Sequence, residues 1–253
     1  MGLGMLRNTF LHLPGVGEKT ERRLWDAGYH TWDELLSAPD ARWPAKLRGG
    51  VGPQWLEEGR AQYEAASWRY FDTHLPGGAK WRAYAPLKDN VLYVDIETDG
   101  YANNITVIGI YDGHCFRAFV ADENLEESLP VLEAASLIVT YNGTGFDMPI
   151  IRSRFPYHLF NHVHIDLMWP LRKLGLRGGL KQIERQMGLA RSEETHQMSG
   201  MDAVYLWQAY QRGSQEAKQR LLQYNEEDVR NLEPLMQWVD RQCRAALGLT
   251  LRP

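Results

Sequence analysis

Cysteine is almost absent from this sequence, because its 253 residues contain only Cys115 and Cys243. These two residues are far apart and have no metal-binding spacing, which excludes a disulfide-rich framework and a cysteine-based zinc motif. We therefore expect reduced thiols and a cytoplasmic protein.

Long apolar runs and a strong charge of one sign are also missing. No run of about 18 apolar residues occurs, so no membrane span or membrane partner is expected. Met1–Phe10 has neither the apolar core nor the cleavage pattern of a signal peptide. The net charge of −4 does not by itself indicate a nucleic-acid binder. The 44% of hydrophobic residues suffice for one sizeable domain and a small one.

Three short segments combine apolar residues with carboxylates. In the first, Val91–Ile96 is rich in β-branched and aromatic residues and follows the turn-like Lys88–Asn90, which predicts a buried strand. Because side chains alternate along a strand, Asp95 and Glu97 share one face. Two carboxylates on one face repel unless a cation lies between them, and their hard oxygens suit Mg²⁺ or Mn²⁺. The alternative is a strand end whose acids meet solvent.

The last segment lies between Ser214 and Arg241, a stretch with no glycine and one proline, Pro234. Its apolar residues recur at spacings that predict an amphipathic helix. Tyr224 and Asp228 are four residues apart and share a face of that helix. A phenol and a carboxylate presented together can hold a water molecule and a metal ion. The alternative is a core tyrosine beside a solvated acid.

The middle segment follows a short predicted strand, Ala135–Thr140. The loop Asn142–Gly145 lies at the carboxyl end of that strand, where ligands bind in α/β sheets. Asp147 lies just inside a predicted helix that runs through Phe155. Asn142 is a candidate donor to a substrate, and its alternative role is a turn residue that caps the loop.

In this order, the three segments resemble the three exonuclease motifs of the DEDD superfamily, in its tyrosine-containing (DEDDy) branch. The pattern Tyr-Asn-x-x-x-Phe-Asp-x-Pro from Tyr141 to Pro149 is also similar to the second motif of the proofreading domain in family B DNA polymerases. With a helix-hairpin-helix-like start and Trp81–Tyr84 before the nuclease region, nearly the whole chain resembles the YprB-like group of stand-alone exonucleases.

The resemblance implies an RNase H-like fold and a two-metal mechanism. Of two Mg²⁺ or Mn²⁺ ions about 4 Å apart, one would activate the attacking water and the other would stabilise the leaving 3′ oxygen. Tyr224 would help to orient that water. The metal ligands implied by the resemblance are Asp95, Glu97, Asp147 and Asp228.

Other titratable residues lie near these motifs. Asp99, where relatives commonly carry threonine, is expected to be a turn acid rather than an outer ligand. Asp166 follows a short apolar strand and is expected to cap a helix or support a ligand. His158, His162 and His164 could form a zinc site, but we expect packing or surface roles because no cysteine or fourth ligand accompanies them.

Basic residues gather between Ile150 and Arg191, where eight basic residues face only two acidic ones. Beside metal-binding acids such a patch could follow a phosphate backbone, with Arg152 and Lys181 as candidate contacts. The alternative is a set of solvated helix faces.

The N-terminal stretch resembles a helix-hairpin-helix motif. Leu11–Gly17 precedes a predicted helix over Glu18–Ala27, and Thr31 is expected to cap a second one. In such motifs glycines let backbone N–H groups approach a DNA phosphate, so the candidate contacts are Gly15, Gly17 and Lys19. The alternative is a tight turn between packed helices.

We expect an α/β protein with an RNase H-like mixed sheet flanked by helices, preceded by a small helical, helix-hairpin-helix-like domain. The expected units are 1–48 (helix-hairpin-helix-like module), 49–89 (a helix around Trp55–Tyr70, then a linker at Pro76–Gly78) and 90–253 (nuclease domain). Further strands are expected near 105–111 and 114–120, and a helix near 126–134.

The resemblance implies a 3′→5′ exonuclease on single-stranded nucleic acid, with DNA favoured over RNA. The alternatives are an exoribonuclease with the same metal centre, a structure-specific endonuclease, and a non-catalytic binding protein with a vestigial nuclease fold. The presence of all four acids and the tyrosine argues against the last of these.

Overall fold

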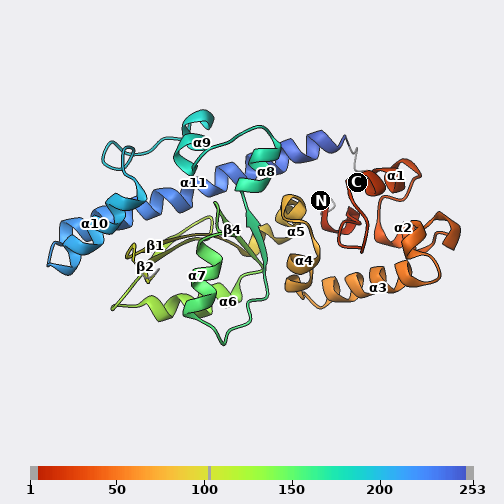
Figure 1. Cartoon of the computed structure of the whole chain (residues 1–253), viewed down its shortest axis with the longest axis horizontal. Coiled ribbons are helices and arrows are strands. Elements are labelled where there is room, and N and C mark those ends of the chain that lie inside the picture. The colour runs from red at the N-terminus through yellow and green to blue at the C-terminus, as the bar shows by residue number, and fades with distance from the viewer. Residues whose placement is uncertain (1–4, 102–103, 249–253) are drawn as a thin grey trace.

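The computed structural model describes residues 5–101 and 104–248, and residues 91–166 contain a five-stranded mixed sheet (Figure 1). Its strands are β1 (Val91–Thr98), β2 (Ile105–Tyr111), β3 (Phe116–Val120), β4 (Leu137–Thr140) and β5 (Val163–Asp166). They follow the order β3-β2-β1-β4-β5, in which β1–β2 and β2–β3 are antiparallel and β1–β4 and β4–β5 are parallel. The predicted fold class, a mixed α/β sheet preceded by a helical region, is confirmed.

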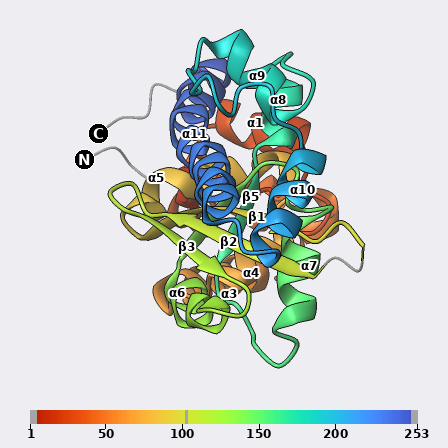
Figure 2. The ribbon, with the colours of Figure 1, turned by 90° about the vertical axis from the view of Figure 1, so that its left-hand side faces the viewer.

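Helices lie on both faces of this sheet. The helices that follow β3 in the described chain are α6 (Ser128–Ala134), α7 (Asp147–Arg154), α8 (Met168–Lys173), α9 (Leu180–Met187), α10 (Gly200–Gln211) and α11 (Gln215–Leu247). A short 3₁₀ helix over Leu125–Glu127 precedes α6. In Figures 1 and 2, α11 crosses one face of the sheet, and α6 and α7 lie on the other. The long helix expected from the spacing of apolar residues is confirmed, and Pro234 lies inside it.

Side chains of β1 alternate between two apolar clusters. The cluster that also contains buried residues of α7 includes Leu92, Val94 and Ile96. Val91 and Tyr93 belong to the cluster on the α11 side of the sheet. Because the alternation continues along the strand, Asp95 and Glu97 also project toward α11. The carboxylates are thus placed by the same pattern that builds the core.

The N-terminal region is helical and packs beside the sheet. Its helices are α1 (Glu18–Asp26), α2 (Trp32–Leu36), α3 (Val51–Glu64), α4 (Trp68–His74) and α5 (Tyr84–Leu87), with 3₁₀ helices at Met5–Asn8, Asp40–Arg42, Ala45–Leu47, Gly77–Ala83 and Lys88–Asn90. Thr31 caps α2 as expected, since its side chain accepts from the N–H of Glu34 and the Glu34 carboxylate accepts from the N–H of Thr31.

The single helix expected around Trp55–Tyr70 is wrong, because the chain breaks between α3 and α4. Ala66 at the break adopts a left-handed conformation with φ of 52°. Asn161, from the loop before β5, satisfies the exposed backbone groups: its amide donates to the Ala66 carbonyl at 2.9 Å and accepts from the Arg69 N–H at 3.1 Å. A side chain 95 residues away in sequence stabilises this break.

The stretch expected to be a linker at Pro76–Gly78 also differs from expectation. It leads directly into the 3₁₀ helix Gly77–Ala83, in which Trp81 and Arg82 are buried. The Arg82 guanidinium donates to both oxygens of the buried Glu21 carboxylate at 2.8 Å. Burial of apolar surface and this ion pair therefore hold the segment against α1. Among the described residues, no helix has the length and apolar character needed to cross a membrane.

Candidate metal centre

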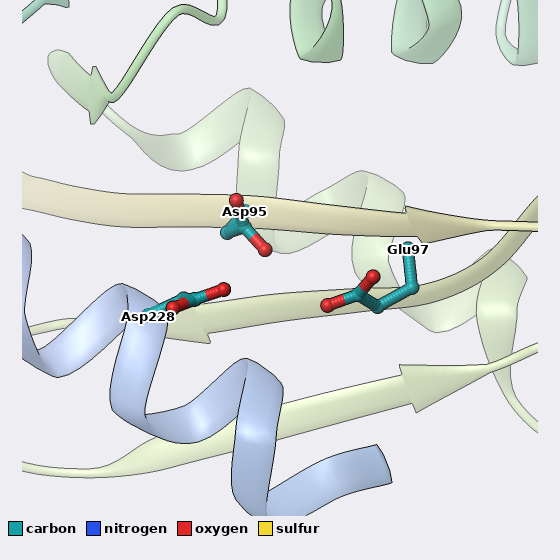
Figure 3. A group of neighbouring side chains, drawn as sticks. All are labelled: Asp95, Glu97 and Asp228. Carbon is teal, nitrogen blue, oxygen red and sulfur yellow. The ribbon is translucent and has the colours of Figure 1, made fainter. Parts of the chain in front are cut away.

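Two elements bring three of the four predicted acids to one place. β1 supplies Asp95 and Glu97, and the middle of α11 supplies Asp228. One carboxylate oxygen from each of these residues lies within 4.8 Å of the others (Figure 3). Oxygens at such separations can contact a common cation, since Mg²⁺ and Mn²⁺ bind carboxylate oxygen at about 2 Å. The hypothesis of two acids on one strand face agrees with this geometry.

Asp147 lies beside this trio rather than in it. It is the first residue of α7, is only 3% exposed, and accepts a hydrogen bond from the Ile96 N–H on β1 at 3.1 Å. Its negative charge contributes to raising the pKa of both Asp95 and Glu97. The fourth predicted acid is therefore electrostatically part of the centre.

The site strongly disfavours four bare negative charges. Burial is the largest cause that raises the pKa of Asp95 and Glu97 well above the usual range, and the charge of Asp228 is the next. Burial also raises the pKa of Asp147 to about 7 and that of Asp228 to about 6, the latter opposed by the nearby Arg191. A cluster of this kind is stable as carboxylates only when cations compensate the charge.

The donor set fits a hard divalent ion. Glu97 Oε1 is buried and has no hydrogen-bond partner among the described residues, although Glu97 lies within the trio of acids. A buried carboxylate oxygen without a donor is unfavourable, so this atom is suited to contact a cation. All the candidate ligands are carboxylates, which suits Mg²⁺ or Mn²⁺ better than softer metals.

Tyr224 lies one helical turn before Asp228 and is 6% exposed. Burial first, and then the charges of Asp228 and other site acids, raise the pKa of its phenol well above the usual range. The phenol therefore stays protonated at neutral pH and is available as a hydrogen-bond donor rather than a base.

Asn225 and Gly109 also shape the site, although they were not identified as candidates from the sequence. The fully buried Asn225 donates to Asp95 Oδ2 at 3.0 Å. Gly109 on β2 is paired with Asp95, and a Cβ atom at Gly109 would lie 1.7 Å from Asn225 Oδ1. An isolated glycine inside a strand is the sequence signal for such a close approach.

The basic patch expected between residues 150 and 191 is divided by the fold. Lys181 lies over the Tyr224 ring, with Nζ 4.3 Å from the ring centroid, and Arg191 forms an ion pair with Asp228. Arg154 and Lys173 form ion pairs with Glu126 and Glu18. The remaining basic residues of the patch, Arg152, Arg172, Arg177 and Arg185, are exposed.

Asp166 organises the loop that leads to Asp147. Its carboxylate accepts from the N–H groups of Asn142 at 2.7 Å, Thr144 at 3.0 Å and Met168 at 3.0 Å. Asn142 itself is exposed and left-handed, with φ of 62°, so it fits the turn role and leaves its side chain accessible. The supporting role expected for Asp166 agrees with these contacts.

The remaining titratable residues form no second metal cluster among the described residues. Asp99 accepts from the Tyr101 N–H at 3.1 Å and from the Asn104 amide at 2.8 Å, as expected for a turn acid. His164 is buried and bonded to Thr140 at 2.8 Å. Burial lowers the pKa of His164 to about 3 and that of His162 to about 4, so both are neutral packing residues.

The glycines of the helix-hairpin-helix-like stretch lie before α1, on the opposite side of Figure 1 from α10. Gly15 has a φ of 73°, and Gly17 is the residue before the first turn of α1. Both are exposed, as is Lys19. The structure therefore does not bring this group together with the acids.

Comparison with known proteins agrees with this architecture. The sequence profile of the RNase H superfamily matches residues 92–240, more than half of the chain. No curated protein matches the sequence. Among solved structures the chain is similar to the family B DNA polymerase from the hyperthermophilic archaeon Pyrobaculum calidifontis, with 16% identity and a TM-score of 0.48. That match covers 59% of this chain and 24% of the polymerase, so the chain spans about a quarter of that protein. The chain belongs to the RNase H superfamily.

Proposed function

We propose that this protein is a metal-dependent 3′→5′ exonuclease of the DEDDy type that acts on single-stranded nucleic acid, with DNA favoured. The observation that carries the proposal is the approach of Asp95, Glu97 and Asp228 within 4.8 Å, supported by Asp147 at the edge and Tyr224 one turn away. Membership of a nuclease superfamily supports phosphodiester hydrolysis as the reaction. The 3′→5′ direction of cleavage and the single-stranded substrate are inferred from the motif resemblance described above.

The protein residues have separate roles in this proposal. Asp95, Glu97, Asp147 and Asp228 hold two divalent ions, Mg²⁺ or Mn²⁺. Bound ions supply Lewis-acid activation of water and neutralise the charge that develops on the phosphate. Tyr224, which stays protonated, donates a hydrogen bond that orients the attacking water. No serine, cysteine or histidine nucleophile is required.

A cleavage assay with end-labelled substrates tests this function. Single- and double-stranded DNA and RNA are incubated with Mn²⁺, and a 3′ ladder on single-stranded DNA is expected. Internal cuts would instead indicate an endonuclease, and preference for RNA an exoribonuclease. No cleavage of any substrate would favour a binding protein with a vestigial site.

The variant Asp147→Asn assigns the activity to this centre. We expect cleavage to fall about a hundredfold or more, because a ligand oxygen and its charge are lost while the shape is kept. The matched control is Glu226→Gln on the same helix as Asp228, since Glu226 pairs with Arg230 outside the trio. Undiminished cleavage by Asp147→Asn would show that the site is wrong.

We also propose that residues 1–48 act as a nucleic-acid-binding module, joined through residues 49–89 to the nuclease domain at 90–253. Gly15, Gly17 and Lys19 would contact a phosphate, and Asn142, Arg152 and Lys181 would contact the substrate near the metal centre. Gly17→Ala tests the module cleanly, because a Cβ there meets no atom within 4 Å and costs little in folding. Lys19→Gln should reduce the salt dependence of binding by about one unit of slope. DNA affinity that is unaltered across salt in both variants would mean that the module is structural.

A further inference from the structure

A buried arginine reaches the candidate metal centre from the stretch between α9 and α10. The Arg191 side chain is 5% exposed, and its guanidinium lies between two carboxylates. It forms two bonds with Glu184, Nε to Oε2 at 2.6 Å and Nη2 to Oε1 at 2.7 Å. Nη2 also donates to Asp228 Oδ1. A candidate metal ligand is therefore already bonded to a fixed cation of the protein.

The surroundings hold Arg191 in this position. Glu184, 1% exposed, is fixed in turn by the amide of Asn231, which donates to Oε1 at 2.9 Å. The residue after Arg191 is attached to α11, because the Ser192 N–H donates to Glu227 Oε1 at 3.2 Å and the Gln223 amide donates to the Ser192 hydroxyl at 3.0 Å. The guanidinium is thus preorganised by a bidentate partner and an anchored backbone.

We propose that Arg191 is a positioning residue that sets the metal affinity of the centre by sharing Asp228 with the bound ion. This inference rests on the proposed metal-dependent nuclease. With Oδ1 of Asp228 engaged by Arg191, Oδ2 is the oxygen left for a cation, so the arginine fixes the direction in which the carboxylate is offered. Its positive charge also opposes the entry of a divalent ion.

Glu184 controls how strongly Arg191 competes for Asp228. The Glu184 carboxylate accepts two of the guanidinium bonds and balances the positive charge. Without the Glu184 charge, Asp228 is the one anion to which Arg191 is hydrogen-bonded in the described structure. Arg191 then competes more strongly with a cation for the Asp228 carboxylate, and the net negative charge around the centre falls. Removal of Arg191 has the opposite effect, because it frees Asp228 and leaves the acids less compensated.

Opposite shifts in Mn²⁺ affinity therefore test the inference. Titration calorimetry of the full chain with MnCl₂, without nucleic acid, is expected to show at least about tenfold tighter binding for Arg191→Gln and at least about tenfold weaker binding for Glu184→Gln. Tenfold corresponds to about 1.4 kcal/mol. Arg185→Gln is the matched control, since Arg185 is an exposed arginine on α9, and its affinity should stay within about twofold of the parent protein.

A purely structural role predicts a different pattern. If Arg191 only holds the fold together, both buried substitutions lower thermal stability and weaken or leave unchanged the binding of Mn²⁺. That result would overturn the inference. If the parent protein itself takes up no Mn²⁺, the proposed function fails first, and the two failures are distinguishable.

The variant Arg191→Lys separates the effect of the positive charge from that of the guanidinium geometry. It also replaces Arg191→Gln as the test if that variant does not fold. Lysine keeps the positive charge but cannot hold both carboxylates in a fixed fork. Mn²⁺ affinity should then stay within about threefold of the parent protein, while the cleavage rate at saturating substrate falls about tenfold or more because Asp228 is no longer oriented. Retention of the full rate by Arg191→Lys would contradict the positioning role.

Discussion

At the scale of single residues, the orientation of the Asp95 carboxylate depends on two uncharged residues, Asn225 and Gly109. The Asn225 amide holds Asp95 Oδ2, and Asn225 fits only because its neighbour on β2 is Gly109. Hydrogen bonds from outside the ligand set commonly fix the direction of metal-binding side chains. A strand position without a side chain thus contributes to the geometry of a carboxylate on the next strand.

Gly109→Ala should therefore impair both stability and activity. The added Cβ would overlap Asn225 Oδ1, which costs about 1–3 kcal/mol of unfolding free energy by overpacking and turns the amide away from Asp95. Urea denaturation and the cleavage assay measure the two effects. In the double variant with Asn225→Ala, stability should partly recover while cleavage stays low. Gly78→Ala, where a Cβ meets no atom within 4 Å, is the control, and equal effects at the two glycines would contradict the steric explanation.

The raised pKa values of the acids predict pH-dependent metal binding. Burial raises the pKa of Asp147 to about 7 and that of Asp228 to about 6, so the metal-free centre retains protons that a bound cation must displace. Mn²⁺ affinity should rise as pH increases from 6 to 8, and proton release on binding should be larger at pH 6 than at pH 8. Calorimetry in buffers of different ionisation enthalpy measures both quantities. If the Mn²⁺ affinity did not change between pH 6 and pH 8, the raised pKa values of Asp147 and Asp228 would be contradicted.

At the scale of secondary structure, local patterns predicted β1 and α11 because each has one dominant periodicity. The same patterns placed Asp95 with Glu97, and Tyr224 with Asp228. They did not predict the break at Ala66, which Asn161 stabilises from a distant loop, nor the position of Arg191 at Asp228. These features depend on contacts between segments far apart in the sequence, and periodicity contains no information about such contacts.

The loop before α7 offers a test at this scale. The Asp166 carboxylate accepts hydrogen bonds from two N–H groups of this loop and from the N–H of Met168 at the start of α8. Asp166→Asn replaces one acceptor oxygen by an amide donor that faces N–H groups of Asn142 or Thr144. We expect a loss of about 2–3 kcal/mol in unfolding free energy and slower cleavage, since this loop positions Asp147. Asp122→Asn, at an exposed position, is the control and should stay within about 0.5 kcal/mol. Normal stability of Asp166→Asn would show that the loop does not need the charge.

At the scale of the whole molecule, the helical region and the sheet share one apolar core. A single cluster of buried residues extends from Met5 and Phe10 through Trp81 to Val163 on β5 and Val239 on α11. The Arg82–Glu21 pair joins the start of the chain to the segment before β1 inside this core. The three sequence units proposed above are therefore expected to unfold together, even if they have separate functions.

Glu21→Gln tests this cooperativity, because it leaves the Arg82 guanidinium buried without a countercharge. Both side chains are less than 5% exposed, so the loss should be about 3–5 kcal/mol of unfolding free energy. Six of the nine tryptophans lie within residues 1–81, so fluorescence reports mainly on the helical region, whereas far-UV circular dichroism reports on the whole chain. In urea the two signals should share one midpoint in the parent protein, and both should shift equally in Glu21→Gln. An earlier fluorescence transition in either protein would show instead that the helical region unfolds while the region that contains the sheet stays intact.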